Sequence, residues 1–338
     1  MENYKWFMGI DVSKGKLDIT VLQGNERVMY EVIENTAKEL NEFAKRVKKQ
    51  EGFKWNECLV CAEHTGIYNA HLLAVSQKQQ WDLCLESAMQ IKQSGGLQRG
   101  KNDAVDSYRI ALYARKNAEF INLWQPPRKV ITELQKLSAL RNRLIGAKNQ
   151  LKRALNEDKA FTNKSILKSM EYCCENSLAA IKDDIETVEE KIKTIIAEDE
   201  ILKKLFAIVE SVPAVGSVMA LKMVITTNEF KNINDPRKYA CYSGVAPFEH
   251  SSGSSIRGQT RTSKKANQQV KTLLHMCSMV AIQHSPEMAA YFERKVKEGK
   301  NKMSVLNGIK NKIIHRVFAC VNRNEHYKKD YKNNLALS

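Results

Sequence analysis

Four acidic residues stand where an apolar run ends or where a helix is predicted to begin. Asp11 follows the first apolar run of the chain, and Glu63 follows a later one. Asp103 and Asp106 are three residues apart at the start of a predicted helix, which places both side chains on one helix face. Carboxylate oxygens suit Mg²⁺, and two such ions can polarise the attacking and leaving oxygens of a phosphodiester. The pattern therefore favours metal-dependent phosphoryl transfer on nucleic acid.

Each of these acids also has a purely structural explanation. Asp11 suits the turn that follows its strand. Asp103 and Asp106 lie in a first helical turn, where the helix dipole favours acids. Two acids at strand ends together with an acidic pair on a following helix are a more specific combination than any of them alone. We expect Mg²⁺, or Mn²⁺ in its place, with Asp11, Glu63, Asp103 and Asp106 as the metal ligands.

The composition agrees with a nucleic-acid partner. The chain has 338 residues, 43% of them hydrophobic, with a formal charge of +16 and a pI of about 9.4. Such an excess favours an anionic partner, although a solvated basic surface is the simpler alternative. No apolar run is long enough to cross a membrane and no signal peptide is visible, so we expect a cytoplasmic protein. Cys58 and Cys61 have zinc-ligand spacing, but without a second such pair they indicate a buried strand.

The acids are positioned by elements that alternate between strand and helix over residues 1–124. Strands are predicted at residues 6–10, 17–22, 28–33, 58–62 and 81–85. Helices are predicted after Thr36, whose partner Glu39 completes a capping box, at residues 71–79 and at residues 103–116. The order of strands and helices predicts a mixed sheet flanked by helices.

Residues 125–201 are predicted to be helical. Gln125, Pro126 and Pro127 mark a boundary, and two apolar seams of heptad spacing follow, separated by a polar connector at residues 156–176. A helical hairpin or coiled coil that joins subunits is expected, with a helical pair inside one subunit as the alternative. The first arm is strongly basic and suits a phosphate backbone. Its candidate nucleic-acid contacts are Arg128, Lys129, Arg141, Arg143, Lys148, Lys152 and Arg153.

Residues 202–325 form a third predicted region, followed by a polar tail at residues 326–338. An apolar helix leads to the turn at residues 212–216, and residues 251–255 are rich in serine and glycine. A basic run and a helix at residues 267–283 come next, and the lysine-rich end of the chain from residue 322 is expected to fray. The basic run adds the candidate phosphate contacts Arg257, Arg261, Lys264 and Lys265.

At both ends the chain resembles the DEDD insertion-sequence transposases, a family that includes Piv/MooV-type DNA invertases and bridge-RNA-guided recombinases. The segments that carry the resemblance are residues 9–14, 63–68 and 101–107, then 212–216, 242–247 and 252–253. Together they extend over about residues 5–120 and 202–285, in the family's order. The resemblance implies an α/β plus all-α architecture. It would comprise a RuvC-like, RNase H-fold mixed-sheet domain, a helical coiled-coil insert and a mainly helical C-terminal transposase domain.

The resemblance also implies functional residues. Asp11, Glu63, Asp103 and Asp106 would be the metal-binding tetrad, and Ser252 would be the nucleophile, with Ser251 beside it as the alternative. The implied partners are donor and target DNA, a structured guide RNA, and further copies of the chain in a dimer or tetramer. Nucleophile and acids would then meet between subunits.

The function expected on this basis is a serine-dependent DNA recombinase of an insertion sequence that is guided by a bridge RNA. The alternatives are a metal-only RuvC-like nuclease or junction resolvase, a protein-directed invertase of the Piv type, and a protein that binds nucleic acid without catalysis.

Overall fold

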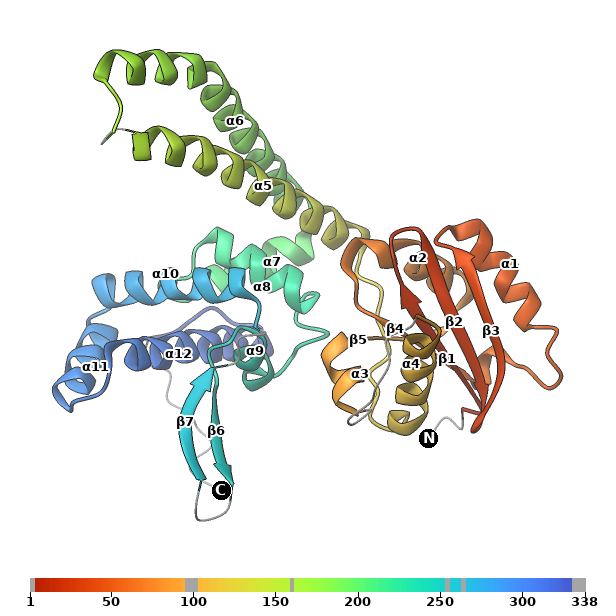
Figure 1. Cartoon of the computed structure of the whole chain (residues 1–338). Helices are drawn as coiled ribbons and strands as arrows, with labels where there is room; N and C mark the ends of the chain where they lie inside the picture. The colour runs from red at the N-terminus through yellow and green to blue at the C-terminus, as the bar shows by residue number, and fades with distance from the viewer. Residues whose placement is uncertain (1–3, 95–102, 159–160, 253–255, 263–265, 330–338) are drawn as a thin grey trace, which may run out of the picture. The chain divides into compact units, whose positions relative to one another are not determined.

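The computed structural model describes residues 4–94, 103–158, 161–252, 256–262 and 266–329 (Figure 1). The chain divides into two compact units, Met1–Pro126 and Pro127–Ser338. The first contains the α/β elements and the second contains the long helices. In the described ranges no helix is long and apolar enough to cross a membrane.

The first unit is built on a five-stranded mixed sheet of order β3-β2-β1-β4-β5. Its first three strands pair antiparallel, whereas β4 pairs parallel with β1, and β5 parallel with β4. This arrangement confirms the mixed sheet that the sequence predicts. The strands are β1 (Trp6–Val12), β2 (Lys16–Gln23), β3 (Glu26–Glu34), β4 (Cys58–Glu63) and β5 (Asp82–Glu86).

Helices cover both faces of this sheet. Thr36 caps the first helix, since its side chain accepts a hydrogen bond from the backbone N–H of Glu39 as the capping box predicts. Its apolar side packs on one face with Trp6, Met8 and their alternating neighbours, while the other face meets the last helix of the unit. The helices are α1 (Ala37–Val47), α2 (Ala70–Gln79), α3 (Ala88–Ser94) and α4 (Asp103–Asn117), with one-turn helices η1 (Trp55–Glu57) and η2 (Gly66–Asn69). Cys58 and Cys61 are fully buried in β4.

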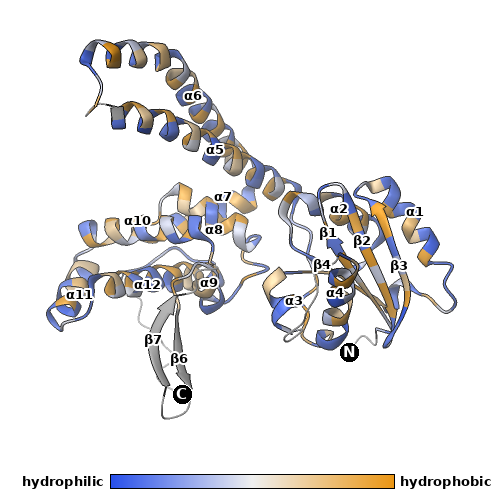
Figure 2. Ribbon diagram, in the orientation of Figure 1, coloured by the Kyte–Doolittle hydropathy of each residue, from blue (hydrophilic) through white to orange (hydrophobic). Residues whose placement is uncertain are grey.

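The second unit begins with a helical hairpin, in which α5 (Lys129–Asp158) and α6 (Lys164–Glu198) lie side by side (Figure 1). Their seams therefore meet within one chain. The polar connector predicted at residues 156–176 is wrong, because α6 already starts at Lys164, where Asn163 caps it. Hydrophobic and hydrophilic colours alternate along both helices (Figure 2).

The rest of the second unit is a helical core with one β-ribbon. The core is continuous, because side chains from α5 and α6 at the root of the hairpin pack into the same apolar cluster as α7 to α12. Its helices are α7 (Glu200–Glu210), α8 (Ser217–Thr227), α9 (Pro236–Tyr242), α10 (Gln268–His284), α11 (Pro286–Lys297) and α12 (Lys302–Arg323). The ribbon pairs β6 (Pro247–Ser252) with β7 (Ile256–Thr262).

The chain end beyond α12 differs from its prediction. Residues 322–338 were expected to fray, but the helix continues to Arg323, and the backbone N–H of Tyr327 donates a 2.8 Å hydrogen bond to Ser211 Oγ. Arg316 also lies over the Tyr327 ring, with its guanidinium carbon 5.3 Å from the ring centre. The described part of this segment is therefore attached to the end of α7.

Candidate active site

The sheet brings acids together by strand register. Asp11 in β1 pairs directly with Asp18 in β2, so their side chains lie on the same face. In the parallel pair, Ile10 stands opposite Ala62, which places Glu63 at the next position along the neighbouring strand. Asp11 and Glu63 thus come from adjacent strand ends, and alternation along each strand directs both toward α4 (Figure 1).

Helix α4 reaches this edge because Gly9 lets it approach the sheet. A Cβ atom at Gly9 would lie 2.2 Å from both the Ala111 nitrogen and the Ser107 carbonyl oxygen, far inside contact distance. The buried hydroxyls of Thr20 and Ser107, 2.9 Å apart, add a hydrogen bond between β2 and α4. Gly9 therefore determines how closely α4, which carries Asp103 and Asp106, approaches the sheet.

Two basic side chains contact the acids at the start of α4. Lys16 Nζ lies 2.7 Å from Asp103 Oδ2 and 3.1 Å from Asp18 Oδ2. Arg109, one turn further along α4, binds Asp106 at 2.9 Å. Lys16 thus bridges β2 and α4 at the edge where the acids gather.

The electrostatics show that the acids influence one another. The pKa of Asp11 is raised from 3.8 to about 6, first by burial and then by the negative charges of Glu63, Asp103, Asp106 and Asp18. The pKa of Glu63 is also raised, by burial and by Asp106. All four acids that the sequence singles out therefore belong to one electrostatic cluster.

The cluster has the chemistry of a cation site. Within the described ranges, no three acid, histidine or cysteine side chains already stand together in a metal-binding arrangement. The donor set nevertheless fits a hard divalent ion, because it consists of carboxylates, and burial followed by the charges of its neighbours raises the pKa of Asp11. The ammonium of Lys16 supplies part of the missing positive charge.

Two buried asparagines fix the loops on either side of this edge. Asn69 donates to the Glu63 carbonyl at 2.9 Å and accepts from the Thr65 N–H at 2.7 Å. Asn35 donates to two carbonyls, that of Ser13 at 2.8 Å and that of Tyr68 at 2.9 Å. Asn35 therefore ties the turn after Asp11 to the loop after Glu63.

Sequence reasoning missed Asp18 and Lys16. Asp18 is buried, accepts a 2.8 Å hydrogen bond from the Tyr30 hydroxyl and lies opposite Asp11. One signal was available, because Leu17, Ile19 and Val21 alternate with polar residues along this strand. An acid inside that alternation must face α4, on the same side as Asp11.

The candidate nucleophile lies in the second unit, in the β-ribbon. Ser252 pairs with Ile256, and Ser251 pairs with Arg257, at one end of the ribbon. Arg261 lies further along β7, opposite Phe248. Lys264 and Lys265 lie outside the described residues.

The basic residues of α5 fall into two groups. Arg128 is held by Asp199 and Glu229, and Arg141 is held by Glu189 at 2.6 Å. These guanidinium groups have internal partners, which favours a structural role for both. The remaining candidates are exposed or half-buried: Lys129, Arg143, Lys148, Lys152 and Arg153.

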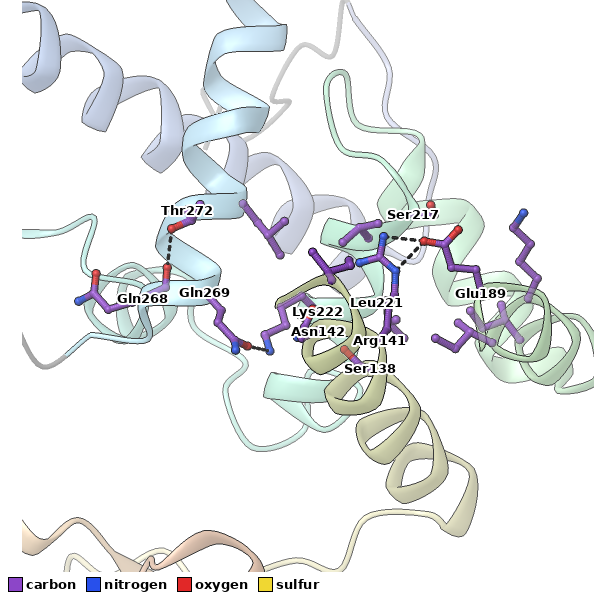
Figure 3. Close-up of a pocket in the computed structure, with 16 residues that line it drawn as sticks. Ser138, Arg141, Asn142, Glu189, Ser217, Leu221, Lys222, Gln268, Gln269 and Thr272 are labelled. Carbon is purple, nitrogen blue, oxygen red and sulfur yellow. Dashed lines mark hydrogen bonds and ion pairs between the residues drawn. The ribbon is translucent and has the colours of Figure 1, made fainter. Parts of the chain in front are cut away.

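A groove of about 640 Å³ lies where the root of the hairpin meets α8 and α10 (Figure 3). The Arg141–Glu189 ion pair stands on one side, and Lys222 donates to the Gln269 side chain at 2.6 Å on the other. Burial lowers the pKa of Lys222. Aliphatic side chains line much of the rest: Ile145, Ile192, Ile196, Val218, Leu221 and Leu273.

Comparison with known families gives two matches. A family profile for a DEDD transposase of IS110 type, described as "Transposase", matches residues 8–157. A second profile, described as "Transposase IS116/IS110/IS902 family", matches residues 207–293. The first match includes all four acids of the cluster, and the second includes the β-ribbon.

Individual proteins agree with these matches. The chain is 22% identical to the pilin gene-inverting protein of Moraxella bovis over 96% of its own length and 98% of the relative's. The Moraxella lacunata protein of the same name gives the same values. The chain is also 24% identical to an uncharacterised IS110 insertion-element protein of Streptomyces coelicolor, over 43% of this chain and 34% of that one.

Proposed function

The chain belongs to the DEDD insertion-sequence transposase family of IS110 type and is a DNA transposase or recombinase, and from this premise we propose how it acts. It cuts and rejoins DNA through a serine-linked intermediate, assisted by a divalent-metal site at the acidic edge of the first unit. Ser252 is the nucleophile. The acids Asp11, Glu63, Asp103 and Asp106 hold the metal.

The observation that carries the proposal is the register of β1 and β4, which puts Asp11 and Glu63 at neighbouring strand ends on the face that meets α4. Four acids from β1, β4 and α4 contribute to one cluster, and the repulsion within it is incompletely balanced by Lys16 and Arg109. A divalent cation would stabilise all four carboxylates at once, and when bound it would supply Lewis-acid polarisation of a phosphodiester oxygen. Acids that only capped strands or helices would have no reason to lie close enough to raise one another's pKa.

A serine-linked intermediate conserves the energy of the phosphodiester. The Ser252 hydroxyl loses its proton, its oxygen forms a bond to phosphorus, and one ester bond of the DNA strand breaks. The released strand end carries a hydroxyl group, which attacks the phosphoserine in the rejoining step and restores the serine. A serine hydroxyl is a weak nucleophile without an activating base or metal, so the proposal requires the acidic site as well.

The test is to trap the protein covalently on DNA. The full chain is expressed with the DNA that flanks its gene, cells are lysed in detergent, and protein-linked DNA is isolated. We expect an adduct from the wild type and none from Ser252→Ala or Asp11→Ala. Glu119→Gln, which changes an exposed acid beyond the other end of α4, is the matched control and should keep the adduct.

Other outcomes assign the chemistry differently. An adduct that survives in Ser252→Ala but disappears in Ser251→Ala moves the nucleophile by one residue. Cleavage without an adduct in any variant would refute the serine mechanism and favour a metal-only nuclease.

The targeting mechanism is a separate part of the proposal. The two Moraxella relatives are named for inverting a pilin gene, which supports a protein-directed invertase as the second candidate. We favour guidance by a structured RNA, because the net charge of +16 and the exposed basic residues of α5 suit a phosphate backbone. RNA that copurifies with the chain, and whose digestion abolishes recombination, would support guidance. Full activity after digestion would support the invertase.

Self-association completes the proposal. Exposed apolar residues lie on both arms of the hairpin and at its connection, and we propose that they join copies of the chain into a dimer or tetramer. Sedimentation of the wild type and of a Phe161→Ser/Tyr172→Ser variant tests this, and the variant should sediment as a smaller species. These apolar residues are Leu140, Phe161, Ile166 and Tyr172.

A further inference from the structure

Two neighbouring apolar side chains next to the acidic edge are exposed to solvent. Ile67 is 76% exposed and Tyr68 is 39% exposed. Both belong to the loop that begins directly after Glu63. Four residues of chain span at most about 14 Å, so the backbone of Ile67 lies within that distance of Glu63. Single exposed apolar side chains are common on protein surfaces, so what distinguishes this pair is the loop that holds it and the charge near it.

The loop is held too firmly for these side chains to be accidental protrusions. Buried Asn69 closes it from the inside by bonding to Glu63 and Thr65. Asn35 holds the Tyr68 carbonyl from outside the loop. Gly66, with φ of +71°, supplies the left-handed turn that presents the next two residues. A loop that is already held in place binds more tightly, because it loses little conformational entropy when the ligand binds.

The surroundings of the two side chains indicate what they bind. Asn35 links the same loop to the turn that carries exposed Lys14, through the Ser13 carbonyl. The segment that carries this cation and the segment that carries the two apolar groups are therefore joined through one side chain. Nucleic acid offers the matching surface, because its phosphates are anionic while its apolar surface is mostly the faces of the bases.

We infer that Ile67 and Tyr68 form a wedge that contacts nucleobase faces next to the phosphodiester bound at the acidic edge. The inference rests on the proposed function, which places that phosphodiester at Asp11 and Glu63. Bases are about 3.4 Å apart along a strand, so the wedge reaches bases within about four nucleotides of the reacting phosphate. The preferred substrate is DNA that is unpaired or easily unstacked at this point, because stacked pairs hide their faces.

Photochemical cross-linking tests this contact. The full chain is prepared with Ile67→p-benzoylphenylalanine, and a second sample carries Phe120→p-benzoylphenylalanine. Phe120 is the matched control, because it is 81% exposed in the same unit but follows the far end of α4. The probe is a labelled duplex with a short unpaired segment, in a buffer with chelator so that no cleavage occurs. We expect a cross-link to bases of the unpaired segment from position 67 and none from position 120.

Binding of the same probe gives a second measurement. Ile67→Ser and Tyr68→Ser should each weaken binding roughly ten-fold, as loss of one base contact does, while Phe120→Ser leaves it unchanged. Cross-linking of position 67 to a second copy of the chain, with unchanged DNA binding, would show a protein interface and overturn the inference. Equal behaviour of positions 67 and 120 would overturn it as well.

Failure of this inference is distinguishable from failure of the proposed function. The cross-link is measured without metal and without the serine reaction. If Asp11→Ala keeps the covalent adduct, the metal proposal fails, whatever position 67 contacts. If Asp11→Ala loses the adduct but position 67 contacts no DNA, only the wedge fails.

Discussion

A Cβ atom at Gly9 would lie 2.2 Å from the backbone nitrogen of Ala111, so α4 rests directly on β1. The atoms that such a Cβ would meet belong to the backbone of α4, and a backbone atom cannot avoid a clash by changing rotamer. The position of the two α4 acids relative to Asp11 therefore depends on the absence of a side chain at this residue.

Gly9→Ala should consequently displace α4. We expect the free energy of unfolding of the first unit to fall by about 3 kcal/mol, the upper range for overpacking a core, together with loss of divalent-metal binding. Denaturant unfolding followed by tryptophan fluorescence measures this selectively, because all four tryptophans lie in the first unit. Gly15→Ala is the control, since nothing lies within 4 Å of a Cβ atom there. Equal stability of the two variants would contradict the close approach.

The raised pKa of Asp11 predicts a pH dependence. Its folded-state pKa is about 6 against 3.8 for the ordinary group, so between these values the folded chain holds a proton that the unfolded chain has released. In the metal-free chain, Asp11 therefore lowers the free energy of unfolding little at pH values below 3.8. The loss grows as the pH rises from 3.8 to about 6, and it is complete above that range. Asp11→Asn should raise the melting temperature by roughly 2–4 °C at neutral pH in chelator.

The comparison across pH tests the sign. The gain from Asp11→Asn should shrink toward pH 4, where the wild-type carboxyl is protonated as well. Metal binding to the wild type should weaken about ten-fold for each pH unit below 6, because the ligand must be ionised. A gain from Asp11→Asn that grows on acidification would mean that Asp11 is stabilised by its surroundings as an anion.

Lys16 competes with a metal for the same carboxylates. Lys16→Met removes the ion pairs with Asp103 and Asp18, so the metal-free chain should be slightly less stable. Mn²⁺ should in turn bind several-fold more tightly, since no ammonium has to be displaced. Calorimetric titration measures the affinity. Lys14→Met, in the same turn, should change neither property, and a weaker Mn²⁺ affinity in Lys16→Met would show that this lysine helps to form the site.

Asn35 is a positioning residue in this arrangement. Asn35→Ala breaks two hydrogen bonds that join the turn after Asp11 to the loop after Glu63, and should cost about 1–3 kcal/mol. A merely structural role would lower stability alone, whereas a positioning role also weakens Mn²⁺ binding, by roughly ten-fold. Asn117→Ala is the control, since it loses a comparable bond to the Tyr113 carbonyl at the other end of α4. The same Mn²⁺ affinity in both variants would exclude the positioning role.

The sheet was predictable because its strands are buried runs that end at turn residues. The runs that stop at Asp11 and Glu63 have a strong local signal, and the Thr36 capping box marks the first helix. The strand order was not predictable, since it is set by pairing between distant residues. For the same reason the sequence did not single out Asp18, whose importance comes from its position opposite Asp11.

The second unit was harder to predict. The ribbon of β6 and β7 has a largely polar sequence without a regular apolar alternation, so no strand signal stood out there. Helices α11 and α12 were missed although Pro286 stands at a helix start and α12 carries a regular apolar face. The connector of the hairpin was overestimated because the first buried residue of α6 is Ile185, so no buried apolar seam marks the start of the helix.

Arg128 has a practical consequence for anyone who divides this chain into fragments. The guanidinium of this residue is the partner of Glu229, whose side chain is only 3% exposed and 101 positions away. A recombinant fragment that began a few residues later would remove this guanidinium and leave Lys231, 2.9 Å from Glu229, to balance the buried carboxylate by itself, which should destabilise the unit. The second unit can therefore be expressed alone only if its first residue lies at or before the prolines that precede Arg128.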